Sequence, residues 1–585
     1  MQRLLPILIL GTFVTLHPAR AVGADDIKTI VTDFDAYSRA QDPVRAAQRG
    51  DAAAARIWPD NSLAAVAARK ASLQQFDQRL RAVPAAGLTD EDALNRELLL
   101  GRVGLALDGF QFDEERLAFI SGDGFYTTAD YAALNTPIDS VADGEAWIAR
   151  LEALPAYYAR ETANLQRGID TGFTQPRRTV ERAIADVRGQ IDQPAATTPL
   201  LAPFRNVAKT LPAAEVAALE ARARKVVATQ VKPAQQSLLE FLERAYLPAA
   251  RPDIGIGTVA QGEAYYAYLA RRHTSTTMTP AEIHALGERE VQRIRARMEE
   301  TIAQAGFKGS IQEFLAAVRK DSRFYVDADE YGRRCAEVAK RADFAMPKFF
   351  GRLPRLSYGV MPMPAGLESS ANGYLPGTPE QGVAGMVVYK PWMAEKMPTF
   401  GIAAWVLHEG VPGHHHQISL SQELTDLPEF RRADDVTAYV EGWGLYSEYL
   451  GEEMGIYRDP YEQFGRLSLE IWRACRLVID TGMHVMGWSR ERAMACLQEN
   501  SALAPQEIEF EVDRYIAWPG QALAYKVGEL KIIELRKRAA QRLGAKFDLR
   551  EFHDLLLDAG PMPLDLLEAR VDQWSEARTG QSPAQ

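Results

Sequence analysis

TPAEIHALGEREVQRIRARMEETIAQAG, residues 279–306, is the stretch that decides the fold class. Thr279 and Glu282 have the spacing of a helix capping box, and Pro280 stands at the first helical position, where proline is favoured. Apolar residues then recur at near-helical intervals as far as Ile302, and Gly306 is a typical stop signal. The stretch therefore predicts one long helix that begins and ends at defined residues.

The same signals recur along the chain. Ser310 and Glu313 form a second predicted capping box. Helical periodicity also runs through 26–56, 62–83, 89–109, 142–167, 213–247, 461–486 and 521–541. Residues 351–393 differ, because helical periodicity is lost there and only 386–389 looks like a strand. We predict a mainly α fold with a small β and loop region near 351–393. An irregular stretch of this length is often a lid or a substrate-binding edge, and the alternative is a packed surface excursion.

Composition and the N-terminus narrow the class of protein. The chain has 585 residues and a formal net charge of −11, which gives no sign of nucleic-acid binding. A short apolar run follows Arg3, and an A-x-A cleavage signal ends at Ala21. We predict a signal peptide over 1–21, with cleavage as late as residue 24, and a periplasmic or secreted protein. No cysteine follows the signal, which argues against a lipid anchor, and no later segment predicts a membrane span.

The mature chain divides at stretches rich in proline and glycine. Residues 195–204 and 248–257 are candidate linkers. The second separates a helical N-terminal region, 25–255, from a region over 256–585 that holds eight of the nine histidines. The three cysteines predict no disulfide framework.

HEGVPGHHH, residues 408–416, carries the strongest chemical signal. In H-E-x-x-H the two histidines share one helix face and grip one zinc ion, but here the fifth position is Pro412. Pro412 and the flanking glycines predict a bulge or turn that brings His414 to the place of the missing ligand. Glu409 then lies beside the metal as a general base. The alternative is a solvated turn whose histidines have no chemistry.

A zinc site needs a third protein ligand. Glu441 follows on an apparent helix in apolar company, where an unpaired carboxylate is costly and a metal ion would relieve that cost. Glu448, two turns further on, is an alternative ligand or a partner that orients a histidine. Two imidazoles and a carboxylate suit one zinc ion.

The chain contains four motifs, HEGVPGHHHQ, EGWGLYSEYL, RLVIDTGMH and YIAWPGQALAYKVG. Taken together, they resemble the large bacterial DUF885 family, which is similar to gluzincin-type zinc metallopeptidases. The resemblance covers roughly 260–575. It implies a helical metallopeptidase-like fold with a deep channel, matches His408, Glu409 and His414 to H-E-x-x-P-G-H, and matches Glu441 to the glutamate of E-G-W. The resemblance makes His415 a weaker ligand candidate than His414. It supports zinc-dependent hydrolysis more strongly than it supports any particular substrate.

Two further stretches contain candidates for oxyanion stabilisation and substrate binding. Arg473, Arg476, Asp480 and His484 form one polar stripe on an otherwise apolar helix, which is also typical of a salt-bridge ladder. We predict that Arg476 binds substrate, that Asp480 supports the site and that His484 is a transition-state donor. In 513–528 we predict Tyr525, rather than Tyr515, as the oxyanion donor. Arg514 and Lys526 are predicted to bind substrate.

These residues predict an exported zinc-dependent peptidase, in which Glu409 activates water against a peptide carbonyl. Two alternatives stay open: a zinc hydrolase of a non-peptide amide, and a catalytically inactive metal-binding periplasmic protein. The expected partner is a peptide or small amide. The residues do not indicate an oligomeric state, and they do not distinguish an endopeptidase from an exopeptidase.

Overall fold

The computed structural model describes residues 24–194, 198–205, 207, 211–363, 373–379, 382–432 and 436–579. Helices dominate these residues, as predicted. The N-terminal ones are α1 (Ala24–Gln41), α2 (Pro43–Gln48), α3 (Leu63–Ala82), α4 (Asp90–Gly109), α5 (Thr128–Leu134), α6 (Val141–Thr171), α7 (Arg177–Asp192), α8 (Ala213–Val226), α9 (Lys232–Phe241) and α10 (Leu247–Ala249). The predicted signal peptide, 1–21 with cleavage as late as 24, lies outside the described residues except for Ala24, which begins α1.

The C-terminal helices follow a short connection. They are α11 (Gly262–Thr274), α12 (Pro280–Gln304), α13 (Ile311–Val318), α14 (Ala328–Ala345), α15 (Ile402–Glu409), α16 (His414–Glu423), α17 (Glu429–Arg432), α18 (Thr437–Leu450), α19 (Pro460–Val485), α20 (Arg490–Asn500), α21 (Pro505–Ala517), α22 (Ala524–Leu543), α23 (Leu549–Leu557) and α24 (Leu564–Thr579). Both predicted capping boxes are confirmed, at the starts of α12 and α13. Gly306, just past α12, takes a positive φ of 78°, which explains why the helical pattern stops there.

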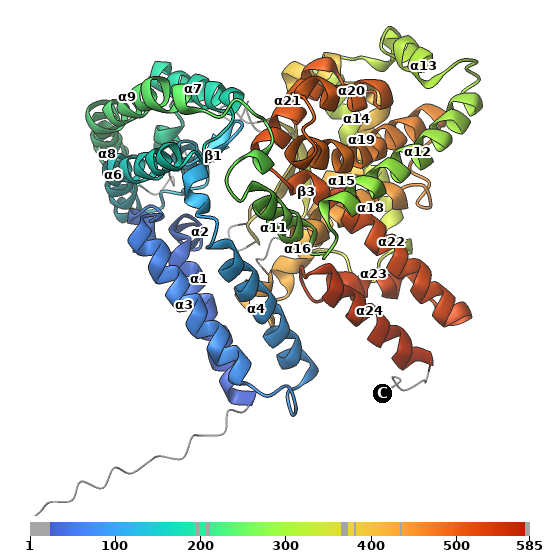
Figure 1. The fold of residues 1–585 in the computed structure, drawn as a ribbon, viewed down its shortest axis with the longest axis horizontal. Helices are drawn as coiled ribbons and strands as arrows, with labels where there is room; N and C mark the ends of the chain where they lie inside the picture. The colour runs from blue at the N-terminus through green and yellow to red at the C-terminus, as the bar shows by residue number, and fades with distance from the viewer. Residues whose placement is uncertain are drawn as a thin grey trace, which may run out of the picture.

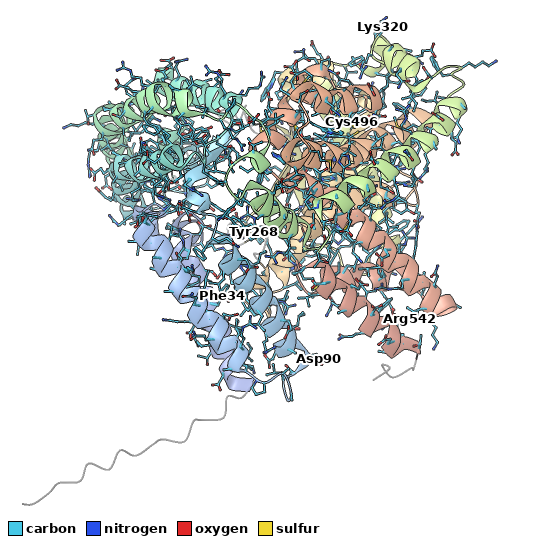
Figure 2. The ribbon with its side chains drawn as sticks, viewed as in Figure 1. Phe34, Asp90, Tyr268, Lys320, Cys496 and Arg542 are labelled. Carbon is cyan, nitrogen blue, oxygen red and sulfur yellow. The ribbon has the colours of Figure 1, made fainter. Side chains whose placement is uncertain are left out.

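Two main hydrophobic cores organise the chain. One lies among α5 to α9 and includes Trp147 and Tyr246. The other joins α1, α3 and α4 to the C-terminal helices, and it buries both Phe34 and Tyr268 (Figure 2). Figure 1 shows α6 to α9 gathered on one side of the molecule, away from α12, α18, α19 and α22. The division into regions at residue 255 stays a prediction, and the larger core draws on residues from both sides of it.

The C-terminal helices pack in close pairs around the histidine-rich turn. α12 packs along α19, and α18 packs along α22. The second pair approaches closely because two glycines face each other: a Cβ added at Gly442 would lie 2.5 Å from the Cα of Gly528. Helix α18 is apolar on most of its surface, as expected for a helix surrounded by protein. This packing places the middle of α18 against the ends of α15 and α16.

Residues 351–393 contain a small sheet beside these helices. The predicted strand is confirmed as β5 (Gly385–Tyr389). It lies between β3 (Tyr358–Pro362), to which it is parallel, and β4 (Gly373–Leu375), to which it is antiparallel. Periodicity did not predict β3 or β4, because they are short and only partly buried. A separate two-stranded pairing joins β1 (Phe119–Ile120) and β2 (Asp123–Gly124).

A helix that spans a bilayer needs about 20 mostly apolar residues. None of the described helices is long and apolar enough to cross a membrane.

Candidate metal centre

The predicted break in the helix lies at the histidine-rich turn. Helix α15 ends at Glu409 and α16 begins at His414. Pro412 follows a cis peptide bond, and the chain returns so closely that a Cβ at Gly413 would lie 1.9 Å from the carbonyl oxygen of His408. Only glycine fits at that approach. The turn therefore replaces the regular helix that would have kept His408 and His414 apart.

Three side chains converge across this turn. His408, His414 and Glu441 each offer one ligand atom, and these atoms all lie within 4.8 Å of one another. The two imidazole rings are nearly perpendicular, with centroids 4.7 Å apart. Among the residues that the structure describes, no other group of three His, Cys, Asp or Glu side chains converges in this way.

One carboxylate oxygen of Glu441 lies close to both histidine rings. Glu441 Oε2 lies 3.5 Å from His408 Nε2 and 3.4 Å from His414 Nε2, and it is buried without a hydrogen-bond partner among the described residues. His408 Nδ1 lies 2.8 Å from Glu448 and therefore carries the proton that this hydrogen bond requires. In the neutral ring the lone pair of Nε2 then faces Glu441. Electron pairs that face one another in a buried site are stabilised by a proton or a metal ion between them, and the donor set of two imidazoles and a carboxylate fits a metal ion.

The electrostatics of the centre also favour positive charge. Burial by itself would lower the pKa of His408, but the neighbouring carboxylates of Glu441 and Glu448 outweigh burial and raise that pKa to about 9, so the space between the imidazole and Glu441 favours a positive charge, either a proton or a metal ion. Glu448 is almost fully buried and accepts from His408, as expected of a residue that orients a ligand.

Glu409 lies beside this group but does not belong to it. Its side chain is buried and lines the same pocket as the three ligand candidates. Burial raises the pKa of the Glu409 carboxyl, and the Glu441 carboxylate adds to the effect. Gly373 of β4 lies alongside, since a Cβ there would be 3.9 Å from Glu409 Oε2.

His415 and His416 point elsewhere. His415 Nδ1 lies 2.9 Å from the hydroxyl of Tyr374 and Nε2 lies 3.0 Å from the carbonyl oxygen of Leu356, so His415 contacts the small sheet region. His416 is fully buried and packs against Phe350. The histidine-rich turn thus supplies two ligand candidates and two packing residues.

Gly444 leaves room for the His408 imidazole. A Cβ at Gly444 would lie 2.7 Å from His408 Cε1 and 2.8 Å from Nε2. We expect Gly444→Ala to displace the ring and to weaken zinc binding about 10- to 100-fold, the effect of disturbing groups that orient a metal-binding histidine. Gly189→Ala in α7, where a Cβ meets nothing within 4 Å, is the matched control. A competition titration that finds equal zinc affinity in both variants would contradict this packing role.

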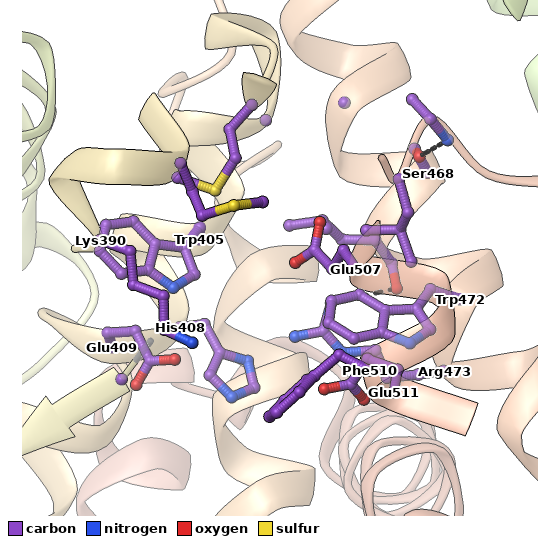
Figure 3. A pocket seen from close by; sticks show the side chains of 18 of the residues that line it. Lys390, Trp405, His408, Glu409, Ser468, Trp472, Arg473, Glu507, Phe510 and Glu511 are labelled. Carbon is purple, nitrogen blue, oxygen red and sulfur yellow. Dashed lines mark hydrogen bonds between the residues drawn. The ribbon is translucent and has the colours of Figure 1, made fainter. Parts of the chain in front are cut away.

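A pocket of about 520 Å³ opens onto the centre. Figure 3 shows Lys390, Trp405, His408 and Glu409 on one side of it, and Glu507, Phe510, Trp472, Arg473 and Glu511 on the other. The lining therefore combines the ligand candidates with aromatic rings and a group of arginines. A pocket with these features is a typical small-ligand or substrate site.

Tyr525, Arg476 and Arg514 all line this pocket. The Tyr525 ring stacks on His408, with centroids 6.3 Å apart and an interplanar angle of 21°. The Arg476 guanidinium lies 4.3 Å from the Tyr525 ring. Burial raises the pKa of Tyr525, and Glu441 adds to it, so the hydroxyl keeps its proton and can donate a hydrogen bond.

The structure places His484 and Lys526 away from the pocket, contrary to the roles predicted for them. His484 lies about 12 Å further along α19 than Arg476, so the stripe runs past the pocket. Its ring nitrogens lie 3.0 Å from the Tyr515 carbonyl oxygen and 3.2 Å from the Ile256 amide. Lys526 is rotated about 100° around α22 from Tyr525 and is fully buried. Its amino group lies 2.8 Å from Glu470 and 3.2 Å from Glu290.

Asp480 also lies outside the pocket lining. It is fully buried and accepts hydrogen bonds from the Tyr266 hydroxyl and from the Gly520 amide at 3.0 Å. Burial raises its pKa to about 7. Asp480 joins α11, α19 and the turn before α22, so its contact with the site is indirect.

The carboxylates on the far wall of the pocket were not predicted from the sequence. Glu507 and Glu511, both in α21, line the pocket, and Glu511 pairs with Arg476 at 2.9 Å. Their spacing of four residues on one amphipathic helix was visible in the sequence. Nothing in that pattern indicated that the helix faces the histidines, because the pairing of α19 with α21 is a tertiary contact.

No curated protein matches the chain. A structure from Colwellia psychrerythraea, described as a "putative lipoprotein", has 26% identity and a TM-score of 0.89, covering 95% of this chain and 100% of that one. One from Shewanella oneidensis, described as a "putative lipoprotein of unknown function", has 18% identity and a TM-score of 0.68, covering 93% and 99%.

A third structure is too dissimilar to bear on the fold. It is described as a "putative oligoendopeptidase F" from Bacillus anthracis str. Ames, and it has 12% identity and a TM-score of 0.29, covering 89% of this chain and 97% of that one. The family model described as "Bacterial protein of unknown function (DUF885)" matches residues 43–571, so the chain belongs to the DUF885 family.

Proposed function

We propose that this protein is an exported, zinc-dependent hydrolase of peptide bonds. The observation that carries the proposal is the convergence of His408, His414 and Glu441 on one point beside the free carboxylate of Glu409. The donor set of two imidazoles and one carboxylate, with a pocket at its open side, is the set used by catalytic zinc sites. The predicted signal peptide supports export, as does the similar Colwellia psychrerythraea structure described as a "putative lipoprotein".

The ligand candidates would bind the metal ion, and Glu409 would transfer protons. His408, His414 and Glu441 would hold the ion, and Glu448 would fix the orientation of His408. A bound zinc ion would polarise the substrate carbonyl and lower the pKa of water. Glu409 would take a proton from water as its oxygen bonds to the carbonyl carbon. When the C–N bond breaks, Glu409 would pass that proton to the leaving amine.

Tyr525 would stabilise the oxygen that gains negative charge. Its ring stacks on His408, and its hydroxyl lies 3.4 Å from the amide nitrogen of Gln521, so both ends of the side chain are held. A neutral hydroxyl in a buried pocket is an effective donor to a developing oxyanion.

We expect Tyr525→Phe to lower kcat for peptide hydrolysis about 10²- to 10³-fold, because one oxyanion donor is lost. Zinc content should not change, since Tyr525 is not among the ligand candidates. Steady-state kinetics and metal analysis of the same preparation test this. Full kcat in Tyr525→Phe would remove the residue from the mechanism.

The proposal as a whole is tested on the purified mature chain. We expect one zinc ion per chain, hydrolysis of members of a peptide library followed by mass spectrometry, loss of hydrolysis on chelation and recovery on adding zinc. If the zinc-bound protein cleaves no peptide but hydrolyses other amides, the substrate is a non-peptide amide and not a peptide. Protein that holds no metal ion would end the proposal.

A further inference from the structure

Three arginines form one wall of the pocket. Arg473 and Arg476 come from α19 and Arg514 comes from α21. Arg473 and Arg476 are almost fully buried, with 4% and 2% of their surface exposed. Three guanidinium groups, which keep their charge at any ordinary pH, are costly in such a place unless anions neutralise them.

The carboxylates on this wall neutralise the arginines only in part. One oxygen of Glu511 serves both Arg476, at 2.9 Å, and Arg514, at 3.2 Å. Glu448 lies 3.4 Å from Arg473 but already accepts from His408. Burial, together with the neighbouring Glu511, raises the pKa of Glu507 to about 7, so Glu507 carries only part of a charge near neutrality.

Several guanidinium nitrogens are left without an acceptor. Arg476 Nη1, Arg473 Nε and Arg514 Nε are buried and have no hydrogen-bond partner among the described residues. An unsatisfied buried donor on a charged group is destabilising, because it loses its hydration and gains no hydrogen bond in return. Because these residues line the pocket, an anion bound there would offset their positive charge and offer acceptors to guanidinium groups that lack them.

The wall lies close to the metal centre. Tyr525 stacks on His408 and is itself 4.3 Å from the Arg476 guanidinium. One extended peptide residue spans about 3.3–3.6 Å, so two successive contacts of 6.3 Å and 4.3 Å put this wall within about three residues of a carbonyl at the metal centre. Trp472 and Phe510 lie on the same wall, which suits an apolar side chain better than an acidic one.

We infer that Arg476 and Arg514, with Arg473 beside them, bind the free C-terminal carboxylate of a peptide substrate. The inference rests on the proposed function and adds that the enzyme cleaves within about three residues of the C-terminal end. Hydrolysis then breaks the C–N bond near that end, water supplies oxygen and protons to the two products, and the carboxylate on the arginines is unchanged.

The first experiment compares peptides that differ only at the C-terminus. An acetylated peptide ending in phenylalanine is offered as the free acid, as the C-terminal amide, and as an amide with glutamate in place of phenylalanine. We expect kcat/KM for the free acid to exceed that for the phenylalanine amide roughly 10- to 100-fold, the range that charged hydrogen bonds supply. Equal cleavage of acid and amide would overturn the inference and leave the proposed hydrolase intact. Recovery with the glutamate amide would assign the wall to acidic side chains and overturn the inference too.

Variants test the arginines themselves. Arg514→Gln is expected to reduce the preference for the free acid at least about tenfold. Arg490→Gln is the matched control, because both side chains are 15% exposed and paired to a carboxylate, but Arg490 does not line the pocket. Arg514 is preferred to Arg476 for this test, because Arg476 is the more deeply buried and its replacement would destabilise the fold more. An unchanged preference in folded Arg514→Gln would contradict the inference.

A binding measurement keeps the inference testable if no peptide is cleaved. Zinc-loaded Glu409→Gln protein is titrated by calorimetry with N-acetylphenylalanine and with N-acetylphenylalanine amide. We expect the acid to bind at least about tenfold more tightly, and this preference to fall in the Arg514→Gln double variant. Equal binding of the two compounds would overturn the carboxylate site independently of any activity.

Discussion

Replacing Glu409 with glutamine is expected to lower kcat for peptide hydrolysis about 10²- to 10⁴-fold, because the general base is lost. Glutamine keeps the size and the hydrogen-bonding shape of the side chain but cannot accept a proton at neutral pH. Zinc content should stay the same, since His408, His414 and Glu441 are unchanged. Kinetics and metal analysis on one preparation measure both quantities.

The matched control for this variant is Glu395→Gln. Glu395 is an exposed glutamate in the segment before α15 and does not line the pocket. We expect it to retain full activity. Should Glu409→Gln keep both its zinc and its full rate, the proposed role of Glu409 would be wrong, whatever the metal analysis shows for the ligands.

Replacing Glu441 with glutamine is expected to have the largest effect on metal binding. The variant removes the only carboxylate of the ligand group and the negative charge that faces both imidazoles. We expect zinc affinity to fall more than about 100-fold, beyond the 10- to 100-fold typical of residues that only orient a ligand. Because zinc that binds the folded state stabilises it, the thermal stabilisation by added zinc should be lost as well.

Glu448 provides the internal comparison, since it lies seven residues further along α18. Glu448→Gln should weaken zinc binding about 10- to 100-fold, because it alters the hydrogen bond to His408 Nδ1 rather than a ligand. Competition titrations rank the two variants by zinc affinity, and melting curves with and without zinc rank them by thermal stabilisation. If Glu448→Gln proved the more damaging one, the ligand and the orienting residue would have to be exchanged.

Local sequence signals predicted the helices well because those signals act over a few residues. The capping boxes at Thr279 and Ser310 satisfy backbone donors of their own helices, so the neighbouring chain hardly affects them. The break at Pro412 was predictable for the same reason, since proline cannot continue the hydrogen bonding of α15. The strands β3 and β4 escaped prediction because their pairing with β5 depends on residues far apart in the sequence.

The polar stripe on α19 shows that residues on one face of a helix need not all lie in the same site. Arg476 and His484 share a helical face, and the sequence offered no reason to separate them. The structure does separate them, because α19 is longer than the pocket it borders. Lys526 illustrates the same limit, since its neighbour Tyr525 faces the pocket while Lys526 pairs with Glu470 of α19 and Glu290 of α12.

By itself, the sequence determined that the protein is mainly helical, that the chain turns sharply between His408 and His414, and that a glutamate lies beside the first of them. These properties follow from backbone geometry and from spacing along one segment. Only the tertiary structure decided that Glu441 meets both imidazoles, that Tyr525 stacks on one of them and that three arginines lie opposite. Those contacts join α15, α16, α18, α19, α21 and α22, and helix packing, which no single segment encodes, sets the distances between them.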